Sequence, residues 1–270
     1  MQVRHLPRTS AVRRHFFTLL SLILMLALIL CGCDDLSTYT RKKDTTPPVS
    51  GPDQPDAPTY KKRVALTLDD GPNHYDNRTK NTVDELAKYG FRATFFVVGN
   101  RISGGDALEY AVAHGCEIGI HGFTHQKYYD RCTEEEYWNE LNQTADKIHQ
   151  KLPNYDIRLM RPPGGSISHD RLAACPYSVI LWDVDSLDYE HTYNRGDSDE
   201  VCNQKINTIV DNVMRDVHDG SIILMHDIYE STQDAIVLLL ARLAAEGYEV
   251  VTVSELLGDE LAPGRIYYSK

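Results

Sequence analysis

The feature that most constrains the fold is a regular alternation between short apolar runs and amphipathic segments. Seven runs are apolar almost throughout, which is typical of strands buried on both faces of a sheet. Several of the segments between them repeat apolar residues at helical spacing. This alternation predicts a parallel sheet covered by helices. The predicted strands are 64–68, 93–98, 116–120, 158–160, 177–182, 221–225 and 248–251, and the predicted helices are 79–89, 106–114, 133–151, 199–218 and 232–246.

Polar motifs indicate which kind of parallel sheet to expect. Each motif lies where a predicted strand ends, and in (β/α) barrels that end carries the active site. No glycine-rich phosphate loop follows the first strand, so a dinucleotide-binding fold has no support. We therefore expect an α/β fold: an irregular (β/α) barrel of about seven parallel strands, closed or partly open. Thr133 and Glu136 predict a capping box at the start of the longest helix.

The N-terminus has the layout of an export signal. Four arginines precede a mostly apolar run over residues 16–31. The run closes with Leu30-Cys31-Gly32-Cys33, which resembles a bacterial lipobox with Cys33 as the lipidated residue. The alternative is an uncleaved membrane anchor, for which the run is short. Either interpretation of residues 1–33 tethers the rest of the chain to the cell membrane, outside the cytoplasm.

Composition limits the partners of the exported part. Residues 34–60 are polar and rich in proline, which predicts a disordered tether before a single catalytic domain at 61–270. Beyond residue 33 the chain has 24 Lys and Arg against 39 Asp and Glu, a net charge of about −15. Such a balance excludes nucleic acid, whose phosphates need a basic surface. No interface pattern stands out, and we expect a monomer.

Four cysteines lie beyond the signal, and none forms a Cys-x-x-Cys pair, so a zinc–cysteine site is not expected. Export permits disulfides, but the sequence leaves their pairing open. The four are Cys116, Cys132, Cys175 and Cys202. Cys116 lies in an apolar strand pattern, which predicts a buried thiol.

Two adjacent carboxylates, Asp69 and Asp70, end the first predicted strand before a Gly-Pro turn. His121 and His125 follow the third strand at a spacing that would place both on one side of a helical turn. Histidine and carboxylate are common zinc ligands, so one aspartate and the two histidines could hold a metal. The competing interpretations are a solvated turn and two surface histidines.

Three further motifs follow later strands. Arg161 precedes Pro-Pro-Gly-Gly and could hold a carboxylate by a bidentate pair, although an ordinary loop would look the same. Three acids follow Trp182 and could line a sugar site or form a polar loop. His226 ends the most apolar strand, where a lone histidine is more often structural. Five such features at five strand ends are hard to explain without a shared site.

These motifs together resemble the polysaccharide deacetylases of carbohydrate esterase family four, over about residues 61–257. The resemblance implies an irregular barrel of deacetylase type. It also implies hydrolysis of N-acetyl or O-acetyl groups on chitin, peptidoglycan or xylan with one divalent metal, most often zinc, with cobalt or manganese as further possibilities.

The resemblance also implies a role for each matching residue. Asp69 would be the catalytic base, oriented by Arg161, and His226 the general acid, tuned by Asp188. The metal ligands would be Asp70, His121 and His125. Gly164 would bind the oxyanion through its backbone N–H, and Trp182 and Leu224 would line the pocket for the acetyl methyl group.

Three positions depart from the family pattern. Gly122 stands where Ser or Thr is usual, so a hydroxyl that would steady the histidine segment is missing. Gly164 stands where an aromatic residue is usual, which removes one wall of the sugar site. Tyr189 replaces a usual Trp. None of the three removes a catalytic or metal group.

We therefore expect a metal-dependent hydrolase that removes N-acetyl groups from a cell-wall glycan, either peptidoglycan or a chitin-like polymer. The alternatives are an acetyl-xylan esterase with the same site and a catalytically silent glycan-binding lipoprotein.

Overall fold

The computed structural model describes residues 60–73 and 77–270. The predicted signal or anchor at 1–33, the lipobox Cys33 and almost all of the tether at 34–60 lie outside the described residues. Among the helices that the structure does describe, none combines the length and the apolar character needed to cross a membrane.

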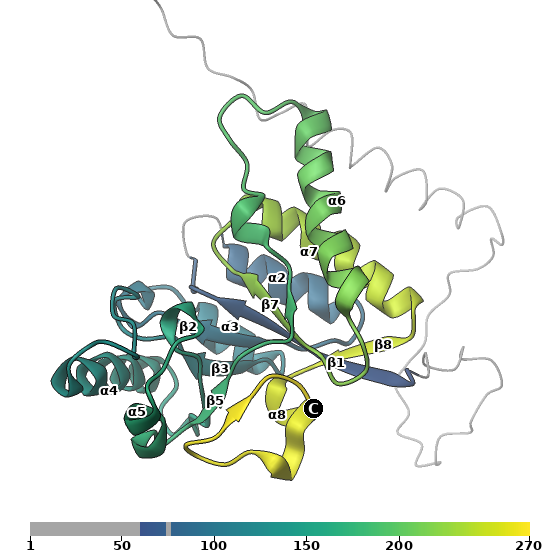
Figure 1. Cartoon of the computed structure of the whole chain (residues 1–270). Coiled ribbons are helices and arrows are strands. Elements are labelled where there is room, and N and C mark those ends of the chain that lie inside the picture. Colours follow the sequence, from purple (N-terminus) through teal and green to yellow (C-terminus); the bar gives the residue numbers. More distant parts are fainter. Residues whose placement is uncertain (1–59, 74–76) are drawn as a thin grey trace, which may run out of the picture. The chain divides into compact units, whose positions relative to one another are not determined.

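In the described residues, nine strands form one sheet, and every pair of neighbouring strands is parallel. The sheet follows the order β6-β7-β1-β2-β3-β4-β5-β9, and β8 pairs with β1. It curls into a half-barrel (Figure 1). All seven predicted strands are present. The strands are β1 (Lys62–Asp69), β2 (Thr94–Val97), β3 (Glu117–Ile120), β4 (Leu159–Met160), β5 (Ser178–Ile180), β6 (Val184–Asp185), β7 (Ile222–His226), β8 (Tyr248–Val251) and β9 (Ile266–Tyr267).

The five predicted helices also form, and the capping box of Thr133 and Glu136 is present at the start of α4. Two short helices were not predicted, and both are too short for a helical repeat to be visible in the sequence. The helices are α2 (Arg78–Ala87), α3 (Ala107–Ala113), α4 (Glu134–Lys151), α5 (His169–Ala174), α6 (Asp199–Asp216), α7 (Glu230–Ala245) and α8 (Val253–Leu257).

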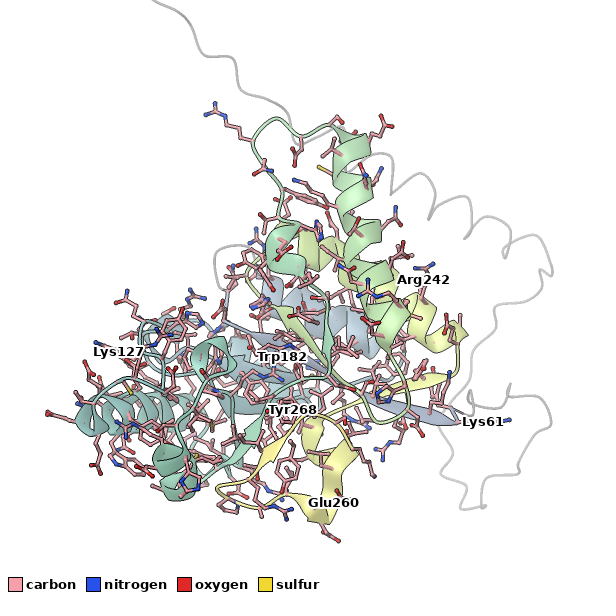
Figure 2. All side chains as sticks on the ribbon, in the orientation of Figure 1. Lys61, Lys127, Trp182, Arg242, Glu260 and Tyr268 are labelled. Atoms are coloured by element: carbon pink, nitrogen blue, oxygen red, sulfur yellow. The ribbon has the colours of Figure 1, made fainter. Side chains whose placement is uncertain are left out.

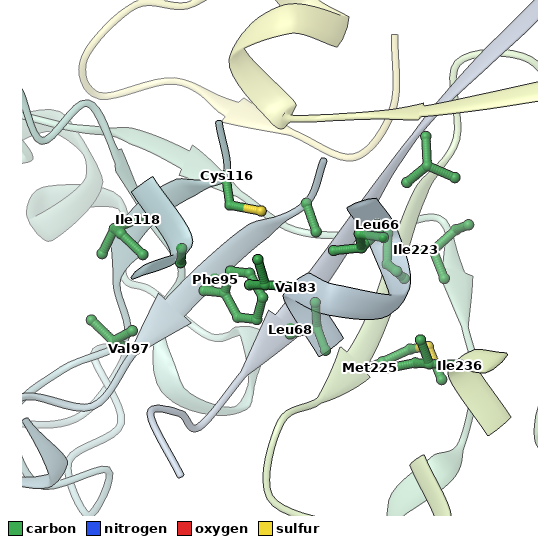
Figure 3. Packing of buried hydrophobic residues seen from close by; sticks show 14 of the residues in the cluster. Leu66, Leu68, Val83, Phe95, Val97, Cys116, Ile118, Ile223, Met225 and Ile236 are labelled. Atoms are coloured by element: carbon green, nitrogen blue, oxygen red, sulfur yellow. The ribbon is translucent and has the colours of Figure 1, made fainter. Parts of the chain in front are cut away.

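The side chains of β1 divide the core into two parts, because successive residues of a strand face opposite sides. Val64, Leu66 and Leu68 belong to the larger cluster between the sheet and its helices. Figure 3 shows this packing, and both Leu68 and Val83 of α2 belong to the cluster. Ala65 belongs to a smaller cluster on the other face, closed by side chains of α8. The remaining inward positions of β1, up to Asp69, are polar, so the site is built on this inner face.

The four described cysteines are all free. Cys116 is buried in the larger cluster, as the strand pattern predicted. Burial raises the pKa of its thiol to about 11, so this group stays protonated at neutral pH.

Candidate active site

Register between neighbouring strands brings the first two candidate residues together. Asp69 ends β1 and His226 ends β7, and the two are paired Cα positions in the parallel ladder. Two residues earlier, Thr67 pairs with Leu224, so these four side chains lie on one face at the carboxyl edge of the sheet. That edge is where ligands bind in barrels of this type.

Asp70, His121 and His125 form a group suited to a metal ion. Each offers one ligand atom, and these atoms lie within 4.8 Å of one another. The Oδ1 atom of Asp70 is 3.2 Å from Nε2 of His125 and 3.8 Å from Nε2 of His121. Asp70 Oδ1 is also buried without a hydrogen-bond partner among the described residues. A buried carboxylate oxygen that accepts no hydrogen bond is costly, and a bound cation would satisfy it.

The hydrogen bond of His121 fixes which ring nitrogen is available to a metal. Its Nδ1 lies 2.9 Å from the backbone carbonyl of Arg161 and donates to it, which leaves the Nε2 lone pair free. Burial lowers the pKa of His121, although the charges of Asp69 and Asp70 oppose that change. A lowered pKa keeps the imidazole neutral, which is the form that binds a metal.

The expected helical turn between the two histidines is wrong. No helix includes this segment, and Gly122 and His125 both have left-handed backbones, with φ of 77° and 61°. The histidines converge because the loop itself is bent.

Glu140 of α4 holds this bent loop in place through hydrogen bonds. Its buried carboxylate accepts hydrogen bonds from the backbone of Phe123 (2.6 Å) and from the backbone and hydroxyl of Thr124 (2.8 and 2.7 Å). A Cβ at Gly122 would lie 3.0 Å from Glu140 Oε2 and 2.9 Å from the Tyr129 hydroxyl. A side chain at 122 would therefore need a strained backbone and a shift of these two groups, and the Glu140 carboxylate holds the loop instead.

The Arg161 side chain is fully buried beneath the site. Its guanidinium donates to Asp69 Oδ1 at 2.8 Å, to the Thr67 hydroxyl, and to the backbone carbonyls of Ile180 and Leu181. One nitrogen contacts Asp69, so the bidentate pair that we expected is wrong. The backbone carbonyls engage the other nitrogens and fix the guanidinium in place.

His226 is held by Asp188, which follows β6. Nδ1 of His226 donates to Asp188 Oδ1 at 2.7 Å, and its backbone N–H donates to Oδ2. Thr232 also donates to this fully buried carboxylate. Burial would lower the pKa of His226, but the hydrogen bond and charge of Asp188, with the charges of the Asp-Asp pair, raise it to about 9.

A cavity of about 440 Å³ joins these groups, and every predicted catalytic and metal-ligating residue lines it except the buried Arg161 and Asp188. Gly164, Trp182, Leu224 and Tyr189 line it as well. Trp182 is labelled near the centre of Figure 2, whereas Lys61 and Glu260 lie at the periphery of that view.

Three contributors were not assigned a role from the sequence. Tyr128 and Tyr229 line the cavity, and Glu140 supports the histidine loop. Only Glu140 carried a usable signal, because it is an acid on the buried stripe of α4 that includes Tyr137 and Leu141.

Comparison with known proteins agrees with this geometry. A family model described as polysaccharide deacetylase matches residues 56–177. A solved structure described as T48 deacetylase with substrate has 35% sequence identity and a TM-score of 0.67, and the match covers 78% of this chain and 98% of that one. The chain belongs to the polysaccharide deacetylase family. The fold prediction is thereby confirmed.

Other members show what this family contains. The peptidoglycan-N-acetylmuramic acid deacetylase PdaC of Bacillus subtilis is 36% identical over 209 residues, which cover 77% of this chain and 41% of PdaC. The chain spans less than half the length of the first curated relatives that it matches. A family 4 acetyl xylan esterase from Clostridium thermocellum was solved in complex with a cobalt ion, and it has 27% sequence identity to this chain and a TM-score of 0.66. The match covers 77% of this chain and 98% of the esterase chain. A divalent metal at the Asp70 group therefore fits the family.

Proposed function

We propose that this chain is a metal-dependent hydrolase that removes N-acetyl groups from a cell-wall glycan, with peptidoglycan as the main substrate. The observation that carries the proposal is the placement of Asp69 and His226 beside the Asp70, His121 and His125 group, at the edge of one cavity. Hydrolysis of an amide needs a base for water and an acid for the departing amine, and these two residues supply them.

We propose zinc as the resident metal, held by Asp70, His121 and His125. When bound, a divalent metal supplies Lewis-acid chemistry, polarising the acetyl carbonyl and lowering the pKa of water.

Asp69 accepts the proton of the attacking water in this proposal. Arg161 engages Oδ1 of Asp69, so Oδ2, which lies 3.6 Å from Nε2 of His121, is the oxygen that faces the metal ligands. The fixed guanidinium prevents the carboxylate from rotating away, which is the contribution of orientation to catalysis.

His226 protonates the leaving amine. At neutral pH a pKa of about 9 keeps its imidazole protonated. Because Nδ1–H points to Asp188, the proton on Nε2 is the one available for transfer, and it goes to the amine nitrogen as the bond to the acetyl carbon breaks. Gly164 would offer a backbone N–H to the oxyanion, and Trp182 and Leu224 would surround the acetyl methyl group.

Peptidoglycan is supported by the relatives, because the first of them is named as a deacetylase of N-acetylmuramic acid in that polymer and others as deacetylases of its N-acetylglucosamine. Such a substrate lies outside the cytoplasm. This location agrees with our proposal that residues 1–33 direct export and that Cys33 carries a lipid anchor. We also propose that the chain acts as a monomer.

Acetyl xylan is the second candidate, because a relative that shares this fold is described as an acetyl xylan esterase. The same acid, base and metal ligands would cleave an ester.

Acetate release from three polymers tests the proposal and separates the two candidates. The zinc-loaded chain is incubated with peptidoglycan, N-acetylglucosamine oligomers and acetylated xylan, with Asp69→Asn as the inactive comparison. Release from peptidoglycan that Asp69→Asn abolishes supports the main proposal, and preference for xylan supports the alternative. Release that is equal in the wild type and in folded Asp69→Asn would show that the role of Asp69 is wrong.

A further inference from the structure

Gly164 leaves a space at the cavity wall, and another residue fills it. The backbone of Gly164 has φ of 65°, and a Cβ placed there would lie 2.6 Å from Cε1 of Tyr128. The ring of Tyr128 thus occupies the space that a side chain at 164 would need. It comes from the loop that follows His125, a different part of the chain.

The position of Tyr128 is fixed by its neighbours. The next residue, Tyr129, is fully buried and bridges to Ile167, and its carbonyl accepts from the backbone of Ser168. These contacts fasten the loop of Tyr128 to the segment that follows Gly164. The guanidinium of Arg131 lies 4.8 Å from the centroid of the Tyr128 ring and supports it.

Tyr128 is also unusually exposed for an aromatic residue at a fixed position. Tyr128 is 41% exposed, and Tyr189 is 42% exposed. Both line the cavity, and the ring of Tyr189 packs edge-on to His226 with centroids 5.6 Å apart. The loop of Tyr128 follows the metal ligand His125, so the two exposed rings flank the metal group and the acid. Exposed, fixed aromatic rings at a cavity are typical of a binding surface.

We propose that Tyr128 is a specificity-determining residue that stacks on a pyranose ring of the glycan and replaces the wall that Gly164 cannot provide. The proposal rests on the proposed function. Sugar rings present flat apolar C–H faces, for which an exposed tyrosine ring is a suitable partner. A hydroxyl on that ring is not required for stacking.

Binding and kinetics with the N-acetylglucosamine tetramer test this role in the full chain. Binding is measured by calorimetry in the Asp69→Asn background, where the tetramer is not consumed, and kinetics are measured by acetate release in the active chain. Tyr128→Ala should raise Kd and KM about 3- to 10-fold, with kcat within about twofold of the parent. Tyr128→Phe should retain both values. Tyr268→Ala is the matched control, because Tyr268 is 53% exposed and is not among the residues that line the cavity.

Two further measurements keep the result interpretable. Tyr128→Leu retains apolar bulk without a flat ring, so it should show the same loss if Tyr128→Ala does not fold. Kd and KM that stay within twofold of the parent in a folded Tyr128→Ala or Tyr128→Leu variant would overturn the inference alone. A wild-type chain that releases acetate from no glycan would instead overturn the proposed function, and this inference with it.

Discussion

Replacing Arg161 by methionine removes the guanidinium that contacts Asp69 inside the site. The Arg161 side chain is fully buried, and that of Asp69 is 4% exposed. Methionine fills similar space but leaves a buried carboxylate without its charge partner, and the Thr67 hydroxyl and two backbone carbonyls lose a donor. Breaking a buried ion pair in this way costs about 3–5 kcal/mol. That is a large part of the roughly 5–15 kcal/mol that stabilises a folded domain.

The cost is measured by urea unfolding of the metal-free protein, followed by circular dichroism at pH 7. Arg242→Met is the matched control, because Arg242 forms an equally direct but exposed ion pair with Asp211 at 2.6 Å. Exposed pairs contribute less than about 1 kcal/mol. The double variant Arg161→Met/Asp69→Asn should lose less stability than the two single variants combined, by about 0.5–3 kcal/mol. If Arg161→Met is no more destabilising than Arg242→Met, the buried pair is not what stabilises this site.

Three further changes have defined outcomes. Asp188→Asn should lower the pKa of His226 from about 9 toward its ordinary value of 6.5. The ion pair of His226 with Asp188 therefore stabilises the fold fully below about pH 6.5, and this stabilisation is lost as the pH rises through about 9. An NMR titration of the His226 imidazole in metal-free protein measures the pKa, and an unchanged pKa in Asp188→Asn would contradict the prediction. Glu140→Gln should weaken metal affinity about 10- to 100-fold in chelator competition, whereas Glu135→Gln, at an exposed position of the same helix, should not. Equal affinities of Glu140→Gln and the wild type would mean that the histidine loop needs no carboxylate. Phe95→Ala, at a position of the larger core cluster that is 1% exposed, should cost about 3–5 kcal/mol in urea unfolding. A loss below about 1 kcal/mol would contradict close packing of this residue.

The strands could be predicted because each is a dense apolar run, and six of the seven are followed directly by a polar residue. Asp69, Arg161 and His226 are all found there, and parallel register then brings them together. The two extra strands, β6 and β9, span two residues each, so neither carries a pattern of its own.

The sequence could not predict contacts made between loops. His121 and His125 have helical spacing, yet the left-handed backbone at Gly122 and His125 sends the chain along a different path. The loss of an aromatic wall at Gly164 could be predicted, but its replacement by Tyr128 depends on how Tyr129 packs, which is a tertiary contact. Propensity and periodicity describe local structure and carry no information about such contacts.

The most direct test of the account is a zinc titration of the metal-stripped chain with acetate release from peptidoglycan as the readout. We expect no release from metal-free protein, full release near one equivalent of zinc, and none at any zinc concentration for His125→Ala. Undiminished release from protein shown to contain no metal would contradict it.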